Sequence, residues 1–406
     1  MPPPGPLLRR GPRPLALHLM GSAMRAMASL TPPSPGAWPS WSAASPKSRA
    51  GRAEAARISL ALAEAGASPE AFQAAIWQRL IAQDSAMLAG MAAYRRHPHA
   101  RTLTDPPILW REGAARLLDY GRAADPPVLF VPSLVNRAHV LDLDEGASLM
   151  RWLATQGFRP LLLDWGWPGP AERRFTLTDH IAGRLDRAMA AVPGPLALAG
   201  YCMGGLLALA AAQRRPEKVS GLALLATPWD FHAAGASQPR GLAACLPGFE
   251  PMLEAHGALS VDALQTLFAT LDPFAIPEKF RAFGRLAQDS PRARRFVVLE
   301  DWLNDGVPLA APVARETLAG WYGRNDTARG EWLVAGQPMR PEGFSGPAFI
   351  AVPKRDRIVP PASAMPLAAM RGATLHVAAA GHIGMVAGQN AEAALWRPLR
   401  NWLAGL

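Results

Sequence analysis

Cysteine is scarce in this chain: among its 406 residues only Cys202 and Cys245 are cysteines. So few cysteines exclude the disulfide framework typical of small secreted domains. No cluster of cysteine and histidine residues has the spacing of a zinc site, and no apolar run approaches the roughly 20 residues that cross a bilayer as a helix. We therefore expect a cytoplasmic protein that needs no metal or other cofactor, with Cys245 as an inert packing residue.

Acidic residues are absent from the first 53 positions, which carry seven arginine and lysine residues and much proline, alanine and serine. This composition predicts a disordered basic arm over residues 1–60. A signal peptide is not indicated, because Pro14 and His18 interrupt the only apolar stretch of the arm. We favour a solvated tail over an arm that binds nucleic acid, and a start codon further along the chain is a further alternative.

The rest of the chain is long enough for one large α/β core with additions. Residues 61–105 are predicted to form a helical segment with an apolar face that needs a partner. From residue 128 onward, strand-like apolar runs alternate with helical patterns, which is typical of a mostly parallel sheet with helices on both faces. We predict the core over 106–228 and 346–406. The stretch between them, 229–345, is too long for a loop and is predicted to form an inserted cap.

A glycine-rich segment near the middle of the chain, Gly200-Tyr201-Cys202-Met203-Gly204-Gly205, separates a strand-like run from an alanine- and leucine-rich helix pattern. A sharp strand-to-helix turn of this form lifts a nucleophile above the sheet and admits only small flanking residues. The N-terminus of the following helix favours a thiolate at Cys202. We therefore interpret Cys202 as a catalytic nucleophile; a buried cysteine on a tight turn is the alternative.

Two later loops supply an acid and a histidine in the chain order typical of the α/β-hydrolase fold. Asp356 follows the apolar run 349–352, and His382 lies on a glycine-flanked loop after a second run, 374–377. In a triad the imidazole removes the thiol proton, and the carboxylate fixes the tautomer of the imidazole. The alternatives are a structural histidine and a salt bridge between Asp356 and a neighbouring arginine.

Two backbone N–H groups are the candidates for binding an oxyanion. One is the N–H of Met203, directly after the nucleophile, and the other comes from the loop that follows the strand-like run 128–131. The usual His-Gly signature of that loop is absent, so the donor is placed within 134–136, with Val135 favoured. An ordinary loop without a catalytic N–H is the alternative.

Several further segments, taken together with these motifs, resemble polyhydroxyalkanoate synthases over residues 70–400. They are Val131-Pro-Ser-Leu-Val-Asn136, Leu141-Asp142-Leu143, Ser148-Leu-Met-Arg-Trp-Leu153, Leu163-Asp-Trp-Gly166, the cysteine turn, Asp356-x-Ile-Val-Pro360, Gly381-His-Ile383 and, in part, Trp321 to Thr327. The chain departs from the family pattern at Arg357, where many synthases carry histidine.

The resemblance implies an α/β-hydrolase fold and an acyltransferase that polymerises (R)-3-hydroxyacyl-CoA into polyester with release of CoA. It also implies that Cys202, Asp356 and His382 are the triad, and that a homodimer, an accessory subunit or a polymer granule surface is the partner. Two other function classes stay open. One is a hydrolase that acts on thioesters, lactones or polyester through the same triad, and the other is a non-catalytic granule protein.

Overall fold

The computed structural model describes residues 9–29, 48–271 and 275–406. Its contacts divide the chain into two compact units. The helical unit comprises residues 1–98 and 272–297, and the sheet unit comprises residues 99–271 and 298–406. Residues 272–297, which the sequence assigned to the cap, therefore group with the N-terminal helices.

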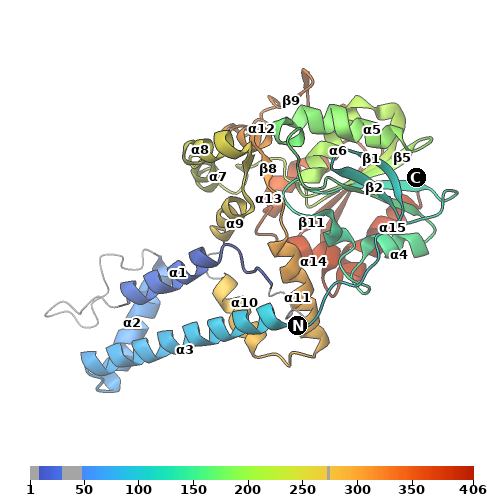
Figure 1. The fold of residues 1–406 in the computed structure, drawn as a ribbon. Helices are drawn as coiled ribbons and strands as arrows, with labels where there is room; N and C mark the ends of the chain where they lie inside the picture. The colour runs from blue at the N-terminus through green and yellow to red at the C-terminus, as the bar shows by residue number, and fades with distance from the viewer. Residues whose placement is uncertain (1–8, 30–47, 272–274) are drawn as a thin grey trace. The chain divides into compact units, whose positions relative to one another are not determined.

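The sheet unit is built on eight strands in the order β1-β2-β4-β3-β5-β6-β11-β12 (Figure 1). Their bounds are β1 Ile108–Glu112, β2 Ala115–Asp119, β3 Pro127–Val131, β4 Arg159–Asp164, β5 Leu196–Tyr201, β6 Val219–Leu225, β11 Ala348–Pro353 and β12 Ala373–Ala378. Strands β1, β2 and β4 pair antiparallel, whereas β4, β3, β5, β6, β11 and β12 pair parallel. The predicted mostly parallel sheet is confirmed.

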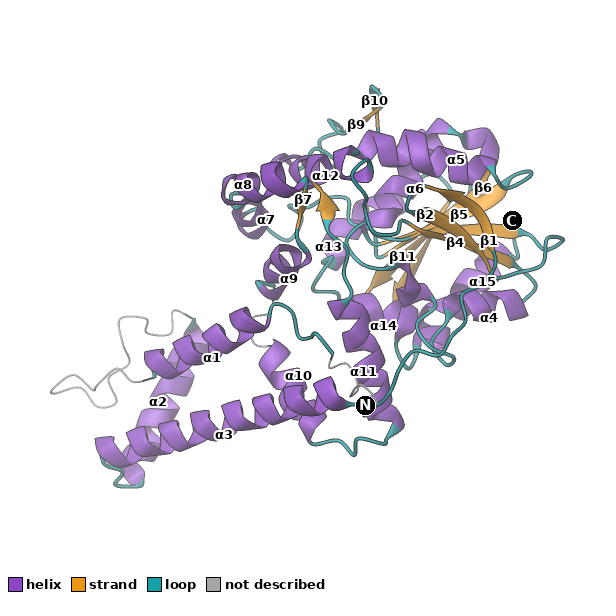
Figure 2. Cartoon of the chain, viewed as in Figure 1, coloured by secondary structure: helices purple, strands orange, loops and turns teal. Residues whose placement is uncertain are grey.

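Helices cover both faces of this sheet (Figure 2). One face carries η3 (Asp179–Leu185), α5 (Asp186–Ala190) and α6 (Met203–Arg214), and the other carries α4 (Leu149–Thr155), α14 (His382–Ala387), η8 (Glu392–Trp396) and α15 (Arg397–Leu403). Every residue of β5 is buried, and successive residues point to opposite faces. Leu196 and Leu198 thus join one apolar core, while Ala197 and Ala199 join the other. Burial on both faces explains why β5 reads as a continuous apolar run.

The chain between β6 and β11 supplies short helices to the sheet unit. These are α7 (Ser237–Ala243), α8 (Leu246–His256), α9 (Val261–Ala269), α12 (Ala311–Arg315) and η5 (Glu316–Arg324), with the paired strands β7 (Ala258–Leu259) and β8 (Leu309–Ala310). The hairpin β9 (Leu333–Val334) and β10 (Gln337–Pro338) follows. Cys245 lies exposed between α7 and α8. The expectation that it is a packing residue is wrong, because its side chain is exposed.

The helical unit contains α1 (Leu15–Ala28), α2 (Arg49–Glu64), α3 (Pro69–Arg96) and α10 (Ala275–Gly284). The boundary between the units falls within α11 (Pro291–Asn304). Among the described residues, a small core of seven buried side chains joins α3, α10 and α11: Met87, Met91, Tyr94, Phe280, Phe283, Ala293 and Val297. No described helix is both long and apolar enough to span a membrane.

Part of the predicted disordered arm is helical in the structure, which corrects that prediction for residues 15–28 and 49–60. Residues 15–28 consist largely of alanine, leucine and methionine, which are strong helix formers. The hydroxyl of Ser48 accepts a hydrogen bond from the N–H of Gly51 and so caps the start of α2. Residues 1–8 and 30–47 of the arm lie outside the described residues.

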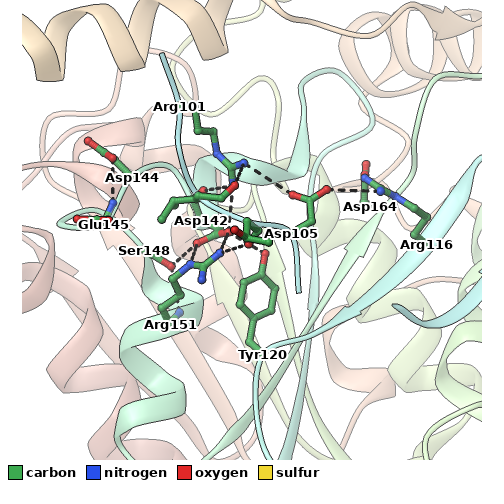
Figure 3. Close-up of polar contacts among 12 residues, drawn as sticks. Arg101, Asp105, Arg116, Tyr120, Asp142, Asp144, Glu145, Ser148, Arg151 and Asp164 are labelled. Carbon is green, nitrogen blue, oxygen red and sulfur yellow. Dashed lines mark hydrogen bonds and ion pairs between the residues drawn. The ribbon is translucent and has the colours of Figure 1, made fainter. Parts of the chain in front are cut away.

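A buried carboxylate, Asp142, fixes the loop between β3 and α4 (Figure 3). Its Oδ1 accepts hydrogen bonds from Ser148 at 2.7 Å and from Arg151 at 2.8 Å, and its Oδ2 accepts from Tyr120 at 3.0 Å and Arg101 at 3.1 Å. Each carboxylate oxygen thus has charged and neutral donors, which offsets the cost of burying the charge. The network is therefore the structural basis of the motif segments around residues 142 and 148.

We predict that Asp142→Asn lowers the free energy of unfolding by about 3 kcal/mol, because both arginines lose the opposite charge that they contact. Urea denaturation of the whole chain measures this change. Asp144→Asn, on the same loop but only partly buried, is the matched control and should change the stability by no more than about 0.5 kcal/mol. Equal effects of the two variants would contradict a special role for Asp142.

A close approach of α3 and α10 depends on Gly90. A Cβ atom built at this position would lie 2.0 Å from the carbonyl oxygen of Phe280. We predict that Gly90→Ala pushes the helices apart and destabilises the helical unit by about 1–3 kcal/mol, measured by thermal unfolding. Gly21→Ala is the control, since nothing lies within 4 Å of its added Cβ. A Tm that is unchanged or raised in Gly90→Ala would refute the prediction.

Candidate active site

The turn between β5 and α6 holds Cys202 in a backbone conformation that is rare for any residue but glycine, with φ 56° and ψ −130°. Its N–H donates to the carbonyl of Leu225 on β6 at 2.8 Å. The flanking glycines allow the close packing of this turn. A Cβ at Gly200 would lie 2.4 Å from the Cα of Gly205, and one at Gly204 would lie 2.1 Å from the carbonyl oxygen of Val131. The predicted strand, sharp turn and helix are all present.

Asp356 and His382 come together at the ends of β11 and β12. The imidazole Nδ1 of His382 donates a hydrogen bond of 2.6 Å to Oδ2 of Asp356. The other carboxylate oxygen, Oδ1, accepts from the N–H groups of Ile358 at 2.8 Å and Val359 at 2.9 Å. Both side chains are buried. The carboxylate is thus held by backbone donors and in turn fixes the orientation of the imidazole.

The Cys202 sulfur lies close enough to His382 to accept a hydrogen bond and to act on its charge. Burial alone would lower the pKa of His382, but the negative charge on Cys202 and the hydrogen bonds to Asp356 and Cys202 outweigh it and raise this pKa to about 10. The arrangement therefore favours the imidazolium form of His382. The structure thus places Cys202 near the hydrogen-bonded pair of His382 and Asp356.

The two predicted oxyanion donors, Met203 and Val135, both line the cavity beside Cys202. The N–H of Met203 opens α6 and has no acceptor within the helix. The N–H of Val135 donates to the Ser133 hydroxyl at 3.2 Å. The roles of both residues remain predictions, and the second donor is engaged by a side chain in this conformation.

A cavity of about 350 Å³ opens above Cys202. Its walls come from the loops that follow the core strands and from α7, α9 and η5, and they are mostly apolar. Leu242, Leu264, Leu267, Phe268 and Leu318 are among the lining residues. A cavity of this size falls in the usual range for small-molecule sites. The insertion between β6 and β11 thus covers the nucleophile with apolar side chains.

The segment after η5 holds this cover to the core. Asn325, in a left-handed conformation with φ 62°, donates to Oδ1 of Asp230 at 2.8 Å and accepts from the N–H of Phe231 at 2.9 Å. The hydroxyl of Thr327 donates to the carbonyl of Trp229. These contacts tie the residues that follow Tyr322, a residue of the cavity wall, to the segment after β6. The motif from Trp321 to Thr327 indicated this region, but no role for Tyr322 followed from the motif.

The comparisons with known proteins agree with the fold. The model of the alpha/beta hydrolase fold family matches residues 126–388. The chain therefore belongs to the α/β-hydrolase fold family.

Curated relatives named poly(3-hydroxyalkanoate) polymerase subunit PhaC are similar to most of this chain. The protein from Haloferax mediterranei is 28% identical over 311 residues, which cover 73% of this chain and 63% of that protein. The protein from Synechocystis sp. is 29% identical over 68% of this chain and 77% of its own length, and the one from Allochromatium vinosum is 27% identical over 68% and 80%. The resemblance to polyhydroxyalkanoate synthases is confirmed by these relatives.

The pKa of His382 tests whether this side chain interacts with the sulfur of Cys202. We predict that His382 titrates at about pH 10 in the wild-type protein and at a clearly lower pH in Cys202→Ala. The pKa of His382 should fall because the negative charge of the sulfur stabilises the imidazolium. Removing the sulfur therefore favours the neutral imidazole. NMR of the ¹⁵N-labelled imidazole through the alkaline range measures this shift. Cys245→Ala should leave the titration unchanged; an identical titration in Cys202→Ala would contradict the pairing.

Proposed function

We propose that this protein is an acyltransferase that polymerises (R)-3-hydroxyacyl-CoA into polyhydroxyalkanoate and releases CoA. The observation that carries the proposal is a cysteine on the sharp turn after β5 that lies near a buried, hydrogen-bonded His–Asp pair and lines a mostly apolar cavity. Similarity to the curated polymerase subunits supports the choice of substrate and product. No cofactor takes part in this reaction, since CoA belongs to the substrate.

In the first step the Cys202 thiolate attacks the carbonyl carbon of the acyl thioester. The resulting oxyanion collapses, the bond to the CoA sulfur breaks, and the CoA thiolate takes the proton from the imidazolium of His382. One thioester replaces another, so this exchange is close to thermoneutral and the acyl group on Cys202 stays activated. The N–H of Met203, at the start of α6, faces the developing negative charge.

In the second step His382 acts as the base. Acylation removes the charge from the sulfur, and with it one of the two main causes that raise the pKa of His382. The neutral imidazole then accepts the proton of a 3-hydroxyl group, whose oxygen attacks the acyl group on Cys202. An oxygen ester forms and the cysteine leaves as a thiolate. The more stable ester bond drives the elongation of the chain.

The apolar cover favours a polymerase over a hydrolase. Water in the cavity would hydrolyse the acyl-cysteine through the same triad. Leu242, Leu264 and Phe268 line the space above Cys202 and offer water no hydrogen-bond partners. This lining favours transfer to a hydroxyl of the polyester over transfer to water. We further propose that the protein acts in the cytoplasm, at the surface of the growing polymer granule, as a homodimer or with an accessory subunit.

The first experiment gives purified full-length protein (R)-3-hydroxybutyryl-CoA and a longer 3-hydroxyacyl-CoA, and follows both free CoA and insoluble polyester. We expect CoA release with polymer from the wild type and a loss of at least about 10⁴-fold in rate for Cys202→Ala, because the nucleophile is removed. Cys245→Ala, which alters the exposed cysteine, should keep the wild-type rate.

CoA release that yields only free hydroxy acid would replace the polymerase by a thioesterase. Release that persists in Cys202→Ala would exclude the cysteine mechanism altogether. Absence of release with either acyl-CoA, from protein shown to be folded, would contradict the proposed substrate class.

A further inference from the structure

Tyr322, on the last turn of η5, lines the cavity together with Cys202 but has no part in the triad. Its position is fixed by neighbours on the segment after β6. Its backbone carbonyl accepts a hydrogen bond of 2.9 Å from Nε2 of His232, and its ring lies 4.9 Å from that of Phe231, measured between centroids. The contacts of Asn325 hold the same two segments together. The side chain is therefore placed by the fold and not by its own hydroxyl.

The hydroxyl group of Tyr322 makes no hydrogen bond to any residue that the structure describes. Burial and, after it, the negative charge on Cys202 raise the pKa of Tyr322 to about 12. The phenol consequently keeps its proton at neutral pH and remains a hydrogen-bond donor. The influence of the Cys202 charge also indicates that the hydroxyl is near the reacting sulfur, since such effects weaken rapidly with distance.

The oxyanion of the acyl-transfer step needs more than one donor. The N–H of Met203 supplies one, whereas the N–H of Val135 is engaged by the Ser133 hydroxyl at 3.2 Å. We propose that Tyr322 is a further catalytic residue whose hydroxyl donates a hydrogen bond to the oxyanion formed on the acyl thioester at Cys202. The inference rests on the proposed acyltransferase function, and it assigns a role to a cap residue.

The hydroxyl of Tyr322 neither gives nor takes an atom in the proposed reaction. As the carbon–sulfur bond to Cys202 forms, the carbonyl π electrons move to oxygen, and the hydroxyl of Tyr322 stabilises that charge without giving up its proton. When the intermediate collapses, the electrons return, the bond to the leaving group breaks, and the hydrogen bond weakens. Because the interaction is strongest in the transition state, its loss should lower the rate of acylation more than substrate binding.

The test compares two reactions of Cys202 in Tyr322→Phe. Acylation by (R)-3-hydroxybutyryl-CoA or by p-nitrophenyl butyrate passes through an oxyanion, whereas alkylation by iodoacetamide does not. We expect single-turnover acylation to slow by about 10²- to 10³-fold, the usual effect of removing one oxyanion donor, while alkylation keeps the wild-type rate. Tyr120→Phe is the matched control, because it removes the hydroxyl of a half-buried tyrosine that does not line the cavity, and it should acylate at the wild-type rate.

Each outcome decides the inference. Wild-type acylation in Tyr322→Phe overturns it, and so does an equal slowing of acylation and alkylation, which would place the effect on the sulfur or on the fold. Failure of the wild type to release CoA from acyl-CoA would count against the proposed function alone, because acylation by p-nitrophenyl butyrate still forms an oxyanion at Cys202 and still tests the tyrosine.

Discussion

The backbone conformation of Cys202 is the constraint on which the site depends. A positive φ at a residue with a side chain costs about 1–3 kcal/mol, so it persists only where the surroundings enforce it. Two features hold Cys202 in this conformation: the close packing of the turn on β3 and α6, and the hydrogen bond between Cys202 and Leu225. The strained turn directs the sulfur toward His382 at the end of the sheet where the parallel strands finish. It also places the nucleophile at the first turn of α6, where the free N–H groups favour negative charge.

The acid–base pair is assembled by the sheet. Asp356 and His382 follow neighbouring parallel strands, β11 and β12, whose carboxyl ends share one edge. Two backbone N–H groups fix the carboxylate before it contacts the imidazole. The carboxylate and the sulfur then act on the imidazole together, and their combined effect overcomes burial, which by itself would favour the neutral form. In the proposed reaction, acylation removes the charge of the sulfur but not that of the carboxylate, and this leaves the imidazole of His382 as a neutral base.

The cap covers the cavity and also holds the residues that line it in place. Its η5 helix is held to the segment after β6 by the hydrogen bonds of Asn325 and Thr327, so the lining of the cavity is tied to the strand that accepts the Cys202 N–H. A polymerase must exclude water and yet admit a hydroxyl, which requires an apolar cavity with a few polar groups at defined positions. Tyr322 fits this description, because its packed ring lines the same cavity as Cys202 and carries a hydroxyl group that makes no hydrogen bond to the described residues.

The sequence by itself determined the fold class and singled out Cys202, Asp356 and His382 as the candidate triad. Gly200, Gly204 and Gly205 left little choice of local geometry at Cys202, and Asp356 and His382 follow apolar runs that a parallel sheet must bring to one edge. It also predicted the long helix α3 from its spacing. It did not predict the helices within the basic arm, because the basic, proline-rich composition of the arm indicated disorder although residues 15–28 are rich in helix formers. It also did not predict the exposure of Cys245. The engagement of Val135 by Ser133, the contacts of Asn325 with the β6 segment, and the position of Tyr322 beside Cys202 were decided by the tertiary structure alone. They join residues roughly 100 positions apart or depend on which hydrogen-bond partner a loop selects, and neither is encoded in a local pattern.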